Sequence, residues 1–189
     1  MKQIVEKINY NAPVTLSFTF VALVVLLIDS LSGSSRLAVT WFALRPTFDV
    51  NNLFRMVTYV FAHADFNHFF GNFSIILLIG PLIEEKYGSR KLLFMMLATA
   101  LITAIIHIIF FNTWVIGASG IVFMLILLTP FTNMKTGKIP LTFILIAFIY
   151  IGREIFLGLS VVNNVSRFAH IIGGIIGAVI GYFVQNKEN

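Results

Sequence analysis

Residues 92–111 read LLFMMLATALITAIIHIIFF, an apolar run that contains one histidine and no charged residue. A helix needs about 20 apolar residues to cross the hydrocarbon of a bilayer, so this run predicts a membrane-spanning helix. Apolar segments of similar character lie on both sides of it, at 14–31, 66–83, 114–128, 139–156 and 168–184. Because lipid offers no partner to an unpaired backbone group, the expected fold is all-α, a polytopic bundle of six transmembrane helices.

The composition agrees with a membrane protein and excludes several classes of site. Of 189 residues, 58% are hydrophobic and only 11% are charged, which is too little polar surface to cover a soluble globule. The length allows one membrane domain over residues 1–189 and short connections. The absence of cysteine excludes disulfides, thiolate metal sites and a cysteine nucleophile. The first apolar segment lacks a convincing cleavage site, so we expect an uncleaved first span.

The positive charges predict the orientation of the chain in the membrane. The net charge is +5, but the cations lie in short connections, which indicates topology signals and argues against a nucleic-acid partner. With six spans, eight of the 13 Lys and Arg fall on one side, namely Lys2, Lys7, Lys86, Arg90, Lys91, Lys135, Lys138 and Lys187. We therefore expect a multi-pass protein of the cell membrane with both termini in the cytoplasm.

Polar side chains gather near the start of the second, fourth and sixth segments. His68 and Asn72, Ser119, and His170 all lie within the first few turns of these segments. Even-numbered spans start on the same side, so these groups are expected at one shallow depth below the outer surface. Polar groups inside a bilayer are costly to keep there, which makes this layer the candidate functional site.

Small residues predict that the fourth and sixth helices approach closely. Gly173 and Gly177 are four residues apart and therefore lie on one helical face, while Gly117 and Gly120 flank Ser119. Such patterns are also common packing devices without a catalytic role. His170 lies three residues before Gly173, on or near the same stripe, so it is expected to face the fourth helix.

The acidic residues favour a Ser-His dyad. None of the eight lies near His170 in the sequence, and Asp65 is the acid closest to the expected site. A Ser-His-Asp triad uses its acid to orient the imidazole, so packing is expected to do this here. His68 and Asn72 share one helical face and, with the Ser119 amide, could donate to a developing oxyanion. His63, about 140° around the helix from His68, is expected to point elsewhere and to act as a structural anchor.

These motifs resemble the rhomboid family of intramembrane serine proteases. The resemblance covers nearly the whole six-span core and rests on His63-x4-His68-x3-Asn72, Gly117-Ala118-Ser119-Gly120, Ala169-His170-x2-Gly173-x3-Gly177 and Glu84-x3-Gly88. It implies Ser119 as nucleophile, His170 as general base, and His68, Asn72 and the Ser119 amide as oxyanion donors.

The resemblance also implies a reaction and a partner. The family cleaves single-span membrane proteins within the lipid bilayer, near their extracytoplasmic end. The long connection from Ser32 to Thr58 resembles the family's membrane-embedded loop, with Leu53-Phe54-Arg55 where a Trp-Arg pair is usual. Phe123 stands where a tyrosine often stacks on the base; its ring can still stack, but the hydroxyl contact is lost.

Two other classes of function fit parts of the sequence. A metal-dependent membrane enzyme could use His63, His68, His107 and His170, although the chain lacks H-E-x-x-H and a lone His107 more often forms a packing hydrogen bond. A noncatalytic rhomboid relative could bind membrane helices, but it would not need the dyad that this chain retains. The expected protease requires neither cofactor nor metal, and the oligomeric state is left open.

Overall fold

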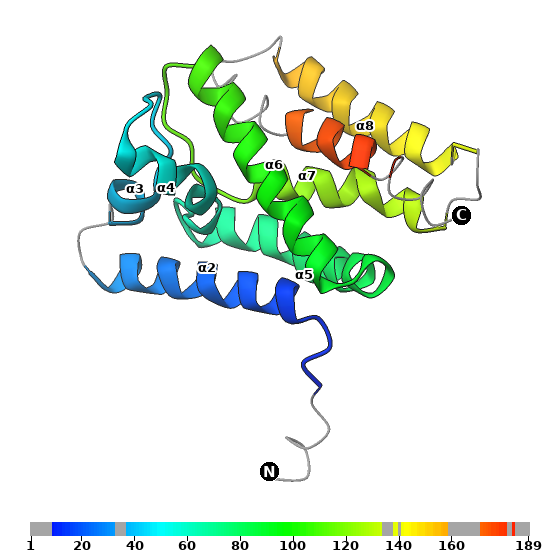
Figure 1. Ribbon diagram of the computed structural model, residues 1–189, viewed down its shortest axis with the longest axis horizontal. Coiled ribbons are helices and arrows are strands. Elements are labelled where there is room, and N and C mark those ends of the chain that lie inside the picture. Colours follow the sequence, from blue (N-terminus) through cyan, green and yellow to red (C-terminus); the bar gives the residue numbers. More distant parts are fainter. Residues whose placement is uncertain are drawn as a thin grey trace.

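The computed structural model describes residues 9–32, 37–133, 138–139, 141–158, 171–180 and 183. These residues form a bundle of helices with α2 along one side and α8 at the opposite side (Figure 1). Among them, three helices are long and apolar enough to cross a membrane: α2 (Pro13–Leu31), α5 (Phe66–Tyr87) and α6 (Ser89–Phe110). The first three expected spans are confirmed as helices of this kind.

The other expected spans coincide with helices of different lengths. Helix α7 (Ser119–Leu128) and residues 171–180 are shorter apolar helices, and α8 covers Leu141–Gly158. The fourth segment is helical only from Ser119, because residues 114–118 form an extended and bent connection instead. The all-α fold is thus confirmed, while the count of six spans stays a prediction.

The long connection between α2 and α5 is structured. It contains α3 (Leu37–Phe42), α4 (Val50–Thr58) and the 3-10 helix η1 (Tyr59–Phe61). Asp49 caps α4 by accepting a hydrogen bond from the Asn52 backbone at 2.9 Å. The Arg55 side chain then donates to the carbonyls of Trp41 at 3.2 Å and Thr40 at 3.1 Å. Arg55 therefore fastens α4 to α3 although the expected tryptophan is replaced by Phe54.

The centre of the bundle is α7. Its residues 120–128 are all buried, and it packs against α5, α6 and α8. A helix that is hydrophobic all round belongs inside a protein, which explains why α7 can be too short to need both membrane surfaces. Helix α5 connects this core to α2, which packs mainly on α5. Many apolar side chains on the outer helices are exposed, as expected where lipid replaces water.

A buried carboxylate joins the α5–α6 turn to the start of α2. Glu84 is 4% exposed and accepts four hydrogen bonds, from the backbone N–H groups of Val14 (2.9 Å) and Thr15 (3.0 Å) and from the hydroxyls of Thr15 (2.8 Å) and Ser89 (2.7 Å). The N-cap of α2, Ala12, has no side-chain acceptor. Glu84 supplies it from another helix, which fixes the position of α2 against α5.

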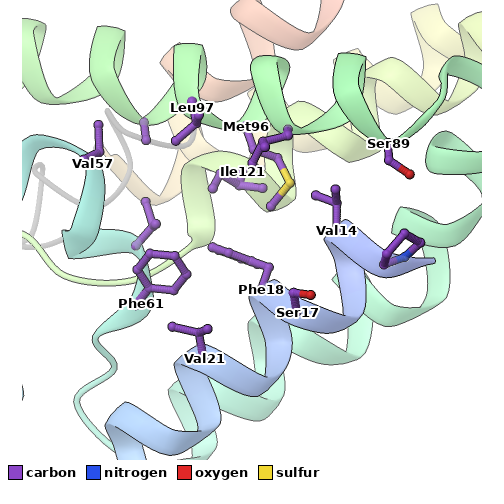
Figure 2. Close-up of a pocket in the computed structure, with 14 residues that line it drawn as sticks. Val14, Ser17, Phe18, Val21, Val57, Phe61, Ser89, Met96, Leu97 and Ile121 are labelled. Atoms are coloured by element: carbon purple, nitrogen blue, oxygen red, sulfur yellow. The ribbon is translucent and has the colours of Figure 1, made fainter. Parts of the chain in front are cut away.

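An apolar cavity of about 450 Å³ lies between α2 and α6. Phe18 of α2, Phe61 of η1, Met96 of α6 and Ile121 of α7 line it (Figure 2). The rings of Phe18 and Phe61 are 5.0 Å apart between centroids. The cavity explains why α2 is held mainly by α5 and η1 and has fewer contacts with α6.

Candidate functional site

The first turns of α5 carry three of the polar residues that the sequence analysis singled out. Asp65 is the N-cap of α5, and its carboxylate accepts a hydrogen bond from the His68 backbone at 2.7 Å. This cap starts the helix so that His68 and Asn72 lie one turn apart on one face. The acid expected closest to the site therefore has a helix-capping role.

His63 lies at the centre of this group, which corrects the expectation that it points elsewhere. That expectation placed His63 on the helix, but α5 begins only at Phe66 and His63 lies in the connection before it. Its ring packs against the His68 ring at 4.8 Å between centroids. Its Nε2 atom lies 3.0 Å from Asn72 Nδ2 and 3.4 Å from the Ala118 backbone nitrogen.

The hydrogen bonds of His63 define its tautomer. Both partners of Nε2 are N–H donors, so Nε2 accepts, and Nδ1 carries the proton and donates to the Phe61 carbonyl at 3.3 Å. The side chain is 1% exposed. Burial, followed by the nearby His68, lowers the pKa of His63 from 6.5 to about 4. His63 is thus a neutral acceptor at physiological pH, and it holds Asn72 and Ala118 together.

The connection before α7 is held against two other parts of the chain. Val115 and Leu44 exchange backbone hydrogen bonds of 2.9 and 3.1 Å, and the Gly117 N–H donates to the Tyr59 carbonyl at 3.0 Å. The Arg45 guanidinium lies 4.9 Å from the centre of the Trp114 ring. The long first connection thereby positions the chain that leads into Ser119.

Gly117 is required at its position for two reasons. Its φ angle is +109°, a conformation that residues with a side chain rarely adopt. A Cβ atom there would also lie 2.7 Å from Cε1 and Nε2 of His68 and 3.7 Å from Nδ2 of Asn72. The backbone of the connection therefore passes directly against both side chains.

Ser119 is the first residue of α7 and is half-buried, whereas Ala118 and Gly120 on either side are buried. Helix starts present backbone N–H groups without an intrahelical acceptor, so the Ser119 amide lies at a place that favours negative charge. Phe123, one turn later, is 8% exposed. The structure thus brings His63, His68 and Asn72 together with the backbone of residues 117–118, directly before Ser119.

Residues 171–180 pack directly on the backbone of α7. A Cβ atom on Gly173 would collide with the Gly120 carbonyl, and one on Gly177 with the Met124 carbonyl. These contacts advance by four residues on each helix, so the two helices run parallel and in register. The close approach expected from the glycine stripe is confirmed. His170 itself lies outside the described residues.

The remaining histidine has a packing role. His107 is buried in α6, its Nε2 lies 2.8 Å from the Thr113 carbonyl oxygen, and its ring stacks on Phe111. This hydrogen bond confirms the packing interpretation of His107. Within the described ranges, no three His, Asp or Glu side chains are grouped as metal ligands.

A family model described as "Rhomboid domain" matches residues 50–187, from α4 to beyond the described part of the last helix. The chain belongs to the rhomboid family. This rhomboid is also 25% identical over 184 residues to the rhomboid protease GlpG of Pectobacterium atrosepticum. The aligned region is 94% of this chain and 65% of that protein, so this rhomboid spans less than two thirds of the relative's length. Membership and the apolar helices together make the chain a multi-pass membrane protein.

Some residues that shape this rhomboid site could not be found from the sequence. The Tyr59 carbonyl and the Leu44 backbone act through main-chain atoms, which every residue possesses. Arg45 and Trp114 are 69 positions apart, and neither carries a motif. His63 was visible as part of a motif, but its contacts depend on where α5 begins.

Proposed function

We propose that the protein is an intramembrane serine endopeptidase with Ser119 as nucleophile and His170 as general base. The observation that carries the proposal is the parallel register of the last helix on α7, set by the Gly173 and Gly177 contacts. Ser119 is one residue before Gly120, and His170 is three residues before Gly173. If the helical path of residues 171–180 is continued backwards, the two residues differ by about 3 Å along the helix axes.

Serine needs an adjacent base to become a nucleophile, and a base from a neighbouring helix must approach within hydrogen-bond reach. Close backbone contact between α7 and the last helix brings their side chains within such reach. Attack of the Ser119 oxygen on the substrate carbonyl would transfer the hydroxyl proton to His170. His170 would then give this proton to the leaving amine, and water would hydrolyse the acyl-enzyme.

The donors around Gly117 fit the needs of the tetrahedral intermediate. The carbonyl oxygen gains negative charge on attack, and fixed N–H donors stabilise it without reorganisation. We assign this role to His68, Asn72 and the Ser119 amide. The Asn72 amide has two N–H groups, one of which is directed to His63. His63 therefore holds Asn72 in place while the second N–H is directed to the oxyanion.

The substrates we propose are single-span membrane proteins, cut near the extracytoplasmic face. The distribution of Lys and Arg supports this orientation, with both termini cytoplasmic. The site then opens toward the outer surface, where water reaches it. A substrate helix must unwind locally there, because a peptide bond in a regular helix is covered by its own hydrogen bonds.

The test is cleavage of a panel of single-span substrates by the purified protein reconstituted in lipid vesicles. Ser119→Ala and His170→Ala should abolish cleavage and leave the protein folded, whereas Asn72→Ala should reduce the rate by about 10²-fold. Ser74→Ala is the matched control, because Ser74 is an exposed serine of α5. A serine-directed phosphonate should label Ser119 in the wild type.

Three results would contradict the proposal in different ways. Cleavage by Ser119→Ala would exclude the nucleophile, and inhibition by chelators alone would favour a metal-dependent enzyme. Binding of substrate helices without cleavage would favour a noncatalytic relative. An unchanged rate in Asn72→Ala would leave the dyad standing but remove Asn72 from the oxyanion site.

A further inference from the structure

A second cavity, of about 380 Å³, lies between the start of α6 and the end of the last helix. Its lining combines two cations, Arg90 and Lys91, with apolar side chains that include Phe94 of α6 and, from the last helix, Val179 and Phe183. Both cations are exposed, as are Phe94 (71%), Phe183 (60%) and Val179 (49%). The groove is therefore open on the outside of the bundle and amphipathic along its length.

The groove lies at the membrane surface opposite to Ser119. Arg90 is in the first turn of α6, while the other end of α6, at Phe110, leads into the connection that carries Gly117 and Ser119. From Arg90 to Phe110 a helix rises about 30 Å, the thickness of the hydrocarbon core. The two cations therefore lie at headgroup level, and the apolar part of the groove, beginning one turn further along α6 at Phe94, lies at the depth of the acyl chains.

We propose that this groove binds one anionic phospholipid. The phosphate and the anionic headgroup contact Arg90 and Lys91, and one acyl chain lies along Phe94, Val179 and Phe183. A guanidinium matches the geometry of phosphate oxygens, and a neighbouring ammonium adds a second positive charge. Basic pockets between spanning helices recognise anionic lipid headgroups in this way. A protein partner would have to approach through the lipid, which already surrounds the groove.

The lipid would connect two parts of the fold that are distant in sequence. Arg90 and Phe94 belong to α6, whereas Val179 follows Gly173 and Gly177 on the helix that packs on α7. A bound acyl chain fills the space between these helices, so it holds the end of the last helix against α6. This role is independent of the peptidase chemistry proposed above and would persist in Ser119→Ala.

The test is lipid retention by the full chain in native mass spectrometry, with Ser119→Ala as a background free of self-cleavage. Detergent-purified protein is mixed with equal amounts of phosphatidylglycerol and phosphatidylcholine of the same acyl chains. Each cation near an anionic headgroup contributes about 5-fold, so the expected preference for phosphatidylglycerol is roughly 25-fold. The double variant R90Q/K91Q should bring the two lipids to near equality.

Two further variants make the test specific to the groove. The double variant K86Q/K138Q removes two exposed cations that do not line the groove, and it should keep the preference. Val179→Trp keeps both cations and fills the apolar part, so it should lower retention of phosphatidylglycerol at least several-fold.

Several results would overturn the proposal. These are equal retention of both lipids by the parent protein, or equal loss of preference in K86Q/K138Q and R90Q/K91Q. Full retention in Val179→Trp would also do so, as would a dimer without lipid that Val179→Trp dissociates, because a second copy of the chain would then occupy the groove.

Discussion

The buried histidine before α5 should make the stability of this protein depend on pH between about 4 and 6.5. His63 accepts two hydrogen bonds at Nε2, from Asn72 and from the Ala118 N–H, and protonation of that atom would break both. His63→Gln is the informative perturbation. A glutamine side-chain oxygen can accept the same two hydrogen bonds but does not titrate.

The magnitude follows from the pKa of His63, which burial lowers from 6.5 to about 4. Above pH 6.5, His63 is neutral in both the folded and the unfolded protein, and its contribution to stability is fully present. As the pH falls through this window, the unfolded chain binds a proton that the folded protein does not, so the folded state loses stability. A shift of this size corresponds to about 3 kcal/mol lost by pH 4.

The assay is unfolding in detergent micelles by titration with a denaturing detergent, at half-unit steps from pH 7 to pH 4. The measured quantity is the difference in the free energy of unfolding between wild type and His63→Gln, which cancels the titration of all other groups. This difference should change by about 3 kcal/mol in favour of the glutamine variant as the pH falls. Parallel curves for the two proteins over the whole range would refute the reasoning.

Three other substitutions test the close contacts of the fold, each by the free energy of unfolding. Gly173→Ala places a methyl group against the α7 backbone and should cost about 1–3 kcal/mol, whereas Gly174→Ala meets only the end of a leucine side chain and should cost much less; equal costs would contradict the backbone contact. Glu84→Gln should cost about 2–3 kcal/mol because a buried four-bond acceptor is lost, and the exposed Glu85→Gln should stay within about 0.5 kcal/mol; a neutral Glu84→Gln would exclude the proposed joint. Gly117→Ala should destabilise by at least about 1 kcal/mol, since its positive φ and the packed imidazole both exclude a side chain; a gain in stability would show that the connection is misplaced.

Apolar length predicted most of the helices well. The segments at 14–31, 66–83 and 92–111 became α2, α5 and α6 with ends shifted by a few residues. The segment at 114–128 was wrong in its first five residues. Apolar composition alone does not reveal that Val115 pairs with Leu44 or that Gly117 adopts a positive φ, because the partners of a backbone group belong to another part of the chain.

The candidate site shows the same division. The spacing of His68 and Asn72 predicted that they share a helical face, since that depends only on helix geometry. The same reasoning failed for His63, five residues before His68, because α5 begins after it at the Asp65 cap. A helix start three residues later changed the direction of one side chain from outside the group to its centre.

The sequence by itself determined that this protein is a helical membrane protein of the rhomboid family, and which glycines let its helices approach one another. These properties depend on local hydrophobicity, on the period of a helix and on the size of side chains, all of which are written along the chain. The tertiary structure decided that His63 holds Asn72 and Ala118 together, that Glu84 caps α2, and that Arg90 and Val179 share a groove. Each of these depends on atoms from separate helices meeting within a few ångströms, and no local pattern contains that distance.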